Sequence, residues 1–524
     1  MAGEGDREEG GMVDRLPVVY VRGYAGTTSG IDAQVDDPFY GFNLGSTHVR
    51  VGSGGDPRFY QFESPLLRLI LDEEYQLLVE GSQAEYLERQ EDGTVPPASI
   101  WIHRYYDISA TTWGERPQDF HLERAAEDLL ELIELLKRRT GAPAVHLVAH
   151  SMGGLICRSL VQKIIPDRYP DRAATDFVAR LFTYGTPHGG IEFDVGFGLF
   201  ERIRDTFGIA GADVFGPRRM YEYLTPERDR DPGGPPAGWD PRVVDDAVFP
   251  RHRIFCLVGT NPNDYGAAFG LSAKTVGAKS DGLVQIDNAH VPGSRHAFVH
   301  RSHSGRYGMV NSEEGYQNLR RFLFGDLAVQ ADLVGLRLPD DDTDVVWQGE
   351  TRLSIRGLPI VLHEQLAAHH CPIQLDGTVT DGTADRPVPL VTTYLSSSAS
   401  RPTDTMRYML QVRVLSLRQH GGVFRFFDHL EQGADFDDVL VVDVAHRGDA
   451  FTAWAVWKSQ LDTPLRDYRP NGPPLTDVDP AAGSWVANIP LAAAARRFLG
   501  ADAAVRLTVS ERSRPWASTG VDGG

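Results

Sequence analysis

The stretch that decides the fold is residues 144–158, which read AVHLVAHSMGGLICR. It opens with a short apolar run suited to a buried parallel strand and continues with helical spacing, which we expect Pro166 to end. The sharp turn between them lifts Ser151 clear of the backbone, while Gly153 and Gly154 let the helix pack close beneath it. The free N–H groups and dipole at a helix N-terminus favour a developing oxyanion, so Ser151 is a candidate nucleophile. The competing interpretation is a buried strand and helix joined by a Gly turn with a chance Ser.

The motif at residues 148–155, followed by Arg158, resembles the nucleophile elbow of α/β-hydrolase lipases and esterases, with Ala149 where most of that family has Gly. The resemblance covers roughly residues 15–325. It implies an α/β-hydrolase fold, which is a mostly parallel sheet flanked by helices, with cap or lid insertions. It also implies a serine carboxylic-ester hydrolase that works through a Ser-Asp-His triad.

The totals narrow the class of protein. With 524 residues, we expect two or more domains. A hydrophobic content of 41% with 24% charged residues is typical of a globular protein, and a net charge of −20 argues against nucleic acid as the main partner. Residues 1–15 are acidic and Gly-rich, without the apolar core of a secretory signal, which predicts a disordered tail and a cytoplasmic location. The three cysteines are widely spaced in apolar contexts and are predicted to be buried and reduced.

Residues 17–21 form an apolar run that predicts the first buried strand, and a Gly-containing turn, Arg22 to Gly26, follows it. A Gly-rich turn after a strand could also cradle phosphate, but the spacing fits neither a P-loop nor a dinucleotide fingerprint. The family resemblance implies that this turn holds half of the oxyanion hole. By that correspondence, the backbone N–H groups of Tyr24 and Met152 are the two donors, although Arg22 replaces the usual His.

The chain then alternates between strands and helices. Residues 27–97 form a long insertion with one helix-like stretch, 66–88. Residues 99–103 predict a strand, and residues 119–139 predict an amphipathic helix that Gly141 stops. Strand, helix, strand, elbow and helix in this order build a parallel sheet by right-handed crossovers.

The catalytic acid has two candidates. Residues 280–284 read SDGLV and resemble the Asp-Gly-x-Val signature of the family, which favours Asp281. The alternative is Asp264, which lies closer to the end of the strand predicted at 253–260. A carboxylate is needed to hold the catalytic imidazole in one tautomer, but either Asp could also be an ordinary turn residue.

Four histidines follow the acid and compete for the role of base. His303 is favoured because it precedes small residues and a helix, where the family's loop His usually falls. His300 is the first alternative, and His290 and His296 remain open. His188, in the Gly-Thr-Pro-His-Gly turn, precedes any plausible acid and is interpreted as a structural or pocket-rim residue.

Residues 191–250 form a second insertion where hydrolase lids usually lie, and its apolar residues Phe197, Leu199 and Phe200 could face an acyl chain. A cap that merely packs on the core is an equal alternative. The helix predicted at 313–325 closes a catalytic domain spanning 16–325.

Period-2 alternation then predicts a C-terminal all-β, sandwich-like domain over 326–512, and residues 513–524 form a tail. The predicted strands include residues 408–414, 423–427, 439–444 and 505–510. The acidic run 340–344 could hold calcium, but a solvated turn explains it as well. This domain could bind protein or a lipid surface, and no motif decides between them.

The sequence therefore predicts a serine ester hydrolase with an acyl ester or lipid as substrate, a chemistry that needs no cofactor or metal. An acyltransferase or thioesterase with the same triad is the nearer alternative. A non-catalytic binding protein on a hydrolase scaffold is the alternative from another class.

Overall fold

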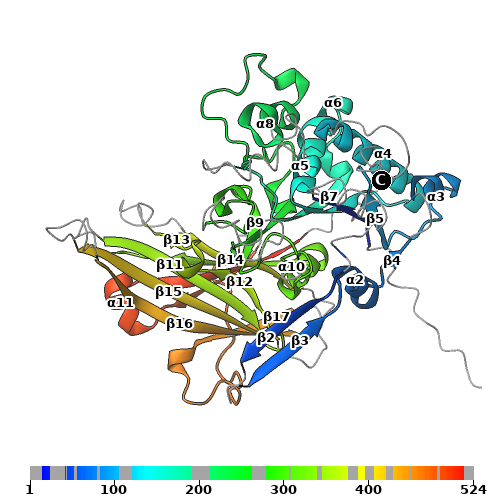
Figure 1. Ribbon diagram of the computed structural model, residues 1–524. Coiled ribbons are helices and arrows are strands. Elements are labelled where there is room, and N and C mark those ends of the chain that lie inside the picture. The colour runs from blue at the N-terminus through cyan, green and yellow to red at the C-terminus, as the bar shows by residue number, and fades with distance from the viewer. Residues whose placement is uncertain are drawn as a thin grey trace, which may run out of the picture.

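A parallel seven-stranded sheet forms the centre of the N-terminal part of the chain (Figure 1). Its strand order is β4-β5-β1-β6-β7-β8-β9, and every described pairing is parallel. The strands are β1 (Val18–Val21), β4 (Gln76–Leu77), β5 (Ser99–His103), β6 (Val145–His150), β7 (Val178–Tyr184), β8 (Ile254–Gly259) and β9 (Arg295–Val299). The sequence had not predicted β9, which continues the sheet beyond β8.

The computed structural model describes most of the chain. The described residues are 15–23, 42, 44–51, 56–78, 83–105, 121–191, 213–262, 279–305, 308–338, 345–375, 387–395, 406–420, 429–447, 450–480 and 484–512. Within these ranges, no helix is both long and apolar enough to cross a membrane.

Both faces of the parallel sheet are buried, because successive strand residues point to opposite faces and both sets are apolar. In β1, Val18 and Tyr20 join the core beneath helices α2 and α10, whereas Val19 and Val21 join the core beneath α4 and α5. Figure 1 shows α4, α5 and α6 together on one side of the sheet, and α10 on the other. These helices are α2 (Pro65–Glu73), α4 (Leu122–Thr140), α5 (Met152–Ser159), α6 (Ile165–Arg168) and α10 (Glu313–Phe324).

The predicted helix at 119–139 is confirmed as α4, which ends at Gly141 in a left-handed conformation with φ of 68°. The prediction of one helical stretch over 66–88 is wrong. Glu74 adopts a left-handed conformation with φ of 57° and ends α2, after which β4 adds an edge strand to the sheet. A second helix, α3 (Gln83–Arg89), follows, and the insertion also contains a hairpin of β2 (Ser46–Val51) and β3 (Pro57–Phe62).

The expectation that Pro166 ends the elbow helix is also wrong. The chain passes from α5 through a π-helical turn, Leu160–Ile164, into α6, which contains Pro166 and continues to Arg168. A proline inside an α-helix clashes with the carbonyl four residues earlier and lacks the N–H that would bond to it. The wider π turn just before Pro166 relaxes the α-helical spacing at that position, so the helix continues.

The C-terminal part contains two antiparallel sheets, which confirms the predicted all-β architecture. A four-stranded sheet has the order β14-β10-β19-β18, and a larger sheet has the order β12-β11-β15-β16-β17 with β13 paired to β11. Predicted strands 408–414, 439–444 and 505–510 lie within β15, β16 and β19, whereas 423–427 lies outside the described residues. The strands are β10 (Leu327–Val334), β11 (Val345–Ile355), β12 (Val361–Gln365), β13 (Ile373–Gln374), β14 (Val388–Leu395), β15 (Met406–His420), β16 (His429–Arg447), β17 (Ala450–Trp457), β18 (Trp485–Pro490) and β19 (Ala504–Glu511). This part of the chain also contains a helix that the sequence had not predicted, α11 (Ala493–Leu499).

Helix α10 lies at the junction of the two parts and contacts strands of both (Figure 1). The Asn318 side chain on α10 donates to the carbonyl of Leu362 on β12 at 2.9 Å. Arg512, just after β19, donates to the carbonyls of Phe322 and Gly325 at the end of α10. The junction between residues 325 and 326 is therefore a packed interface rather than an open linker.

Candidate active site

Ser151 occupies the turn between β6 and α5 in a conformation that L-amino acids rarely adopt, with φ of 53° and ψ of −129°. Its N–H donates to the carbonyl of Tyr184 on β7 at 2.9 Å, and its own carbonyl accepts from the Thr186 hydroxyl at 2.9 Å. These two bonds fasten the strained residue to the end of the neighbouring strand. The side chain is 8% exposed.

The two glycines after Ser151 are required by the close approach of α5 to the sheet. A Cβ on Gly153 would lie 2.3 Å from the carbonyl oxygen of Val21 and 2.4 Å from that of Arg22. A Cβ on Gly154 would lie 2.1 Å from the Thr186 hydroxyl oxygen. Neither gap admits a methyl group, so the sequence pattern follows from the packing of helix on strand.

The structure brings Ser151, His303 and Asp281 into one hydrogen-bonded chain. His303 Nε2 lies 3.0 Å from Ser151 Oγ, and His303 Nδ1 lies 2.9 Å from Asp281 Oδ2. His303 and Asp281 are 2% and 1% exposed, so the contacts are shielded from solvent. With Nδ1 donating to the carboxylate, Nε2 is left to accept the serine proton.

The Asp281 carboxylate is fixed on its far side as well. Its Oδ1 accepts from the N–H groups of Leu283 and Val284, at 3.0 and 2.8 Å. The backbone of Asp281 also accepts from the His303 N–H at 2.8 Å. A Cβ on Gly185 would lie 2.9 Å from Asp281 Oδ2, so glycine is the residue that leaves room for the His–Asp contact.

His150 supports His303 from the strand side, a contact that the sequence analysis missed. Its Nε2 lies 3.0 Å from the carbonyl oxygen of His303, and the two rings lie 4.8 Å apart. Burial, reinforced by the neighbouring His303 ring, lowers the pKa of His150 to about 3. The ring is therefore neutral near pH 7, and because a carbonyl only accepts, Nε2 carries the proton. The sequence signal that could have indicated this role is that His150 directly precedes Ser151.

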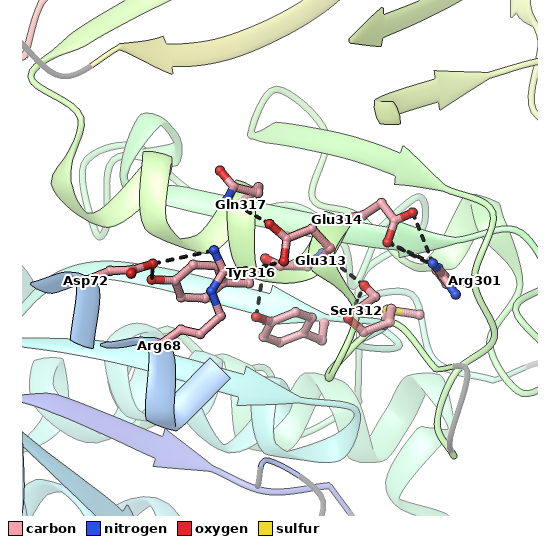
Figure 2. Close-up of polar contacts among 11 residues, drawn as sticks. Arg68, Asp72, Arg301, Ser312, Glu313, Glu314, Tyr316 and Gln317 are labelled. Atoms are coloured by element: carbon pink, nitrogen blue, oxygen red, sulfur yellow. Dashed lines mark hydrogen bonds and ion pairs between the residues drawn. The ribbon is translucent and has the colours of Figure 1, made fainter. Parts of the chain in front are cut away.

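The loop that carries His303 is anchored to α10. Arg301 pairs with Glu314 at 3.1 Å, and both side chains are largely buried. Figure 2 shows this pair beside the network at the start of α10, where Arg68 and Tyr316 both contact Asp72. The N–H of Met309 donates to the carbonyl of Ser302, which closes the loop on itself. The position of His303 thus depends on the position of α10.

One of the two predicted oxyanion donors lies within the described residues. Met152 begins α5 and follows Ser151 directly, so its N–H lies at the positive end of the helix. Tyr24 lies outside the described residues, as does the alternative acid Asp264. Gly23, just before Tyr24, is described, and a Cβ there would lie 2.8 Å from the Ser151 Cβ. Gly23, just after β1, therefore lies directly beside the serine.

The other candidate histidines lie elsewhere. His300 is exposed, contacts the Thr260 hydroxyl at 3.2 Å and stacks on His369 of the C-terminal part at 3.9 Å. His290 and His296 pack against each other near the start of β9, an edge strand of the sheet, whereas Ser151 follows the central strand β6. His188 is fully buried, with Nε2 3.2 Å from the Thr183 hydroxyl. This burial favours the structural interpretation of His188.

Much of the predicted lid, 191–250, including Phe197, Leu199 and Phe200, lies outside the described residues. Its described portion contains α8 (Pro217–Leu224). Arg158 links this insertion to the elbow helix, because its guanidinium donates to the carbonyls of His188 and Val243 at 3.1 and 3.2 Å. Burial lowers the pKa of Arg158 to about 10, which leaves it charged near pH 7.

Metal-ligating side chains do not gather within the described part of the chain, where no group of three or more His, Cys, Asp or Glu side chains could hold an ion. The acidic run 340–344 lies outside that part. The three cysteines are free and buried, as predicted.

Comparison with known proteins finds a family model that matches part of the chain. Residues 99–198 match the model of a family described as alpha/beta hydrolase fold. Among solved structures, the chain is similar to a gene product of Listeria innocua (13% identity, 59% of this chain and 94% of that chain, TM-score 0.25). It is also similar to lipase B of Aspergillus fumigatus (10%, 60% and 53%, TM-score 0.26) and to carboxylesterase CesB of Bacillus subtilis (12%, 59% and 82%, TM-score 0.21). Similarity at this level establishes no shared activity. The fold prediction is confirmed: the N-terminal part has the α/β-hydrolase fold, which supports a hydrolase.

Proposed function

We propose that the chain is a serine ester hydrolase of the lipase or carboxylesterase type. The observation that carries the proposal is the hydrogen-bonded chain from Asp281 through His303 to Ser151, with contacts of 2.9 and 3.0 Å. These are distances at which a base can take a hydroxyl proton. The chain order Ser, Asp, His is the order typical of this fold.

In the proposed reaction, Ser151 Oγ attacks the ester carbonyl carbon while His303 Nε2 takes the serine proton. Asp281 holds the resulting imidazolium by accepting from Nδ1. The tetrahedral intermediate collapses, the C–O bond to the alcohol breaks, and His303 returns the proton to the departing alcohol. Water, deprotonated by the same His303, then attacks the acyl-enzyme, and collapse of the second intermediate releases the acid and restores Ser151.

Negative charge on the intermediate needs two donors aimed at the oxyanion. We assign these to the backbone N–H groups of Met152 and Tyr24. Met152 is supported by its place at the first turn of α5, and Tyr24 by the passage of Gly23 beside Ser151. Loss of a single donor of this kind typically costs a factor of about 100 to 1,000 in kcat.

The test is active-site labelling with a fluorophosphonate, with the modified peptide located by mass spectrometry, together with hydrolysis of p-nitrophenyl esters of increasing acyl length. We expect the label on Ser151, and we expect Ser151→Ala to lose both label and turnover while it keeps its melting temperature. Ser354→Ala, on β11 of the C-terminal part, is the matched control and should keep both. Ester turnover retained by Ser151→Ala would contradict the proposal. Labelling without hydrolysis would favour an acyl acceptor other than water.

A further inference from the structure

The C-terminal part contains a cavity of about 600 Å³ between its two antiparallel sheets. Strands β10 and β19 supply one wall, and β15 and β16 supply the other. Residues 474–480 run along one side: the Leu475 N–H donates to Ala453 on β17, and the Val478 N–H donates to Val486 on β18. The volume lies in the range of about 300 to 1,000 Å³ that small-molecule sites occupy.

The wall of this cavity is mainly aliphatic. Its residues include Val329 on β10, Leu410 on β15, Val442 on β16 and Val509 on β19. Protein interiors are normally packed so tightly that voids larger than a water molecule are few. An empty cavity of this size would deprive its wall of dispersion contacts. The wall therefore suits a flexible apolar ligand.

Acidic side chains in the wall restrict the charge that the head group of such a ligand can carry. Among the described lining residues, Asp477 and Glu511 carry a formal charge near pH 7, and both charges are negative. Asp477 Oδ1 already accepts from the N–H groups of Asp479 and Val486, which fixes the carboxylate in place. A fatty-acid carboxylate or a phosphate head would meet like charge there, whereas a hydroxyl head could donate to the carboxylates.

We propose that this cavity binds one uncharged single-chain lipid, with its aliphatic chain between the sheets and a hydroxyl head near Asp477 and Glu511. The proposal does not depend on the chemistry at Ser151, because the cavity lies within the C-terminal sheets. It assigns this part of the chain a ligand-binding role of its own.

Trp485 lines the cavity and provides a direct probe, although the chain contains eight tryptophans. The experiment titrates the full chain with a dibrominated C18 alcohol, below its solubility limit, and follows quenching of tryptophan fluorescence by bromine. The alcohol contains no ester, so the proposed hydrolase activity cannot consume it. We expect saturable quenching that disappears in Trp485→Phe. Trp454→Phe is the matched control, because Trp454 on β17 points to the carbonyl of Gly472 instead, and it should keep the quenching.

Two further measurements complete the test. Val509→Phe places a ring in the cavity and should weaken binding of the alcohol at least tenfold without lowering the melting temperature. The dibrominated C18 acid, ionised at pH 8, should bind at least tenfold more weakly than the alcohol. Absent saturation, quenching that survives in Trp485→Phe, or equal binding of acid and alcohol would each overturn the proposal. Absent saturation is also the result expected if another segment or a second copy of this chain fills the cavity.

Discussion

The strain at Ser151 shows how single residues build the site. A non-glycine residue in such a conformation costs about 1–3 kcal/mol, which the surrounding contacts must offset. The bonds from Ser151 to Tyr184 and from Thr186 to Ser151 do so with backbone and hydroxyl groups at 2.9 Å. Among the described residues, the other non-glycines with positive φ are Glu74 and His370, neither of which is part of the triad. Strain in this chain therefore accompanies the candidate nucleophile without being confined to it.

At this scale, His150 gives a test of positioning. His150→Phe keeps an aromatic ring but removes the N–H that bonds to the His303 carbonyl. One neutral hydrogen bond contributes about 1 kcal/mol, so we expect kcat/KM for a p-nitrophenyl ester to fall roughly fivefold. Fluorophosphonate labelling should slow by the same factor. The control is His300→Phe, since His300 is exposed and contacts Thr260 rather than the triad. Equal losses in the two variants would contradict this role for His150.

The triad residues are held by contacts with different elements of the fold. Ser151 depends on β6 and α5, whereas His303 depends on the Arg301–Glu314 pair (Figure 2). The two side chains are 12% and 8% exposed, so removal of one partner leaves the other charge poorly solvated.

We therefore expect Arg301→Gln to lower kcat about tenfold, with a smaller change in KM, because the His303 loop loses its attachment to α10. Steady-state kinetics on a p-nitrophenyl ester separates the two constants. Arg89→Gln provides the control: its pair with Glu85 also joins Arg to Glu, but the side chains are 76% and 65% exposed, and such pairs contribute little. If KM alone changes in Arg301→Gln, the anchoring role is wrong.

The contact between α5 and β1 gives a test of stability. Alanine improves helix propensity over glycine by about 1 kcal/mol, yet a Cβ on Gly153 would lie 2.3 Å from the backbone oxygen of Val21. Backbone cannot move aside cheaply, so we expect Gly153→Ala to lower the free energy of unfolding by about 3 kcal/mol. Urea titration measures the change. Gly472→Ala, which meets no heavy atom within 4 Å, should stay close to the wild type. A Gly153→Ala variant as stable as the wild type would show that α5 can retreat from β1.

The sequence predicts an element well when neighbouring residues determine it and poorly when tertiary packing determines it. The elbow and α4 follow from spacing and from Gly stops, so residues 144–158 and 119–139 predicted them correctly. The break at Glu74 and the π turn before Pro166 depend on tertiary packing that no local pattern encodes. Strand β9 begins with two polar residues, Arg295, which donates to Gln330 on β10, and His296, and so it lacks the apolar run of a central strand.

The same reasoning applies to the site. Motifs predicted Ser151 and Asp281, and the order of elements along the chain predicted His303. The supporting contacts, from His150 to His303 and from Arg301 to Glu314, join positions 153 and 13 residues apart and need the folded chain to be seen. Ser151→Ala therefore tests a role that was predicted from a sequence motif, whereas His150→Phe tests a role that was inferred from the structure.

At the scale of the whole molecule, the two parts share an interface at the edge strand β9. An unpaired edge strand is a site for aggregation, and here β12 and β14 of the C-terminal part pack against β9. The Phe298 N–H on β9 donates to Nδ1 of His363 on β12, at 3.4 Å, so the ring of His363 must stay unprotonated at that nitrogen. Burial lowers the pKa of His363 to about 3, and burial also lowers that of His103 on β5 to about 4.

These histidines predict how stability depends on pH. In the unfolded chain both titrate near pH 6.5, so below that pH the unfolded state binds protons that the folded state excludes. Their contribution to stability is complete above pH 6.5 and is lost as the pH falls toward 4 for His103 and 3 for His363. Each lowers the free energy of unfolding by up to about 1.4 kcal/mol per pH unit in that window. His363→Gln removes one such group, while the Gln side-chain oxygen can still accept the Phe298 N–H. Urea titrations at pH 7.0, 5.5 and 4.5 should therefore show a shallower loss for His363→Gln than for the wild type, by about that slope. Parallel losses would mean that His363 is protonated in the folded chain, and that the interface between β9 and β12 opens to solvent above pH 4.5.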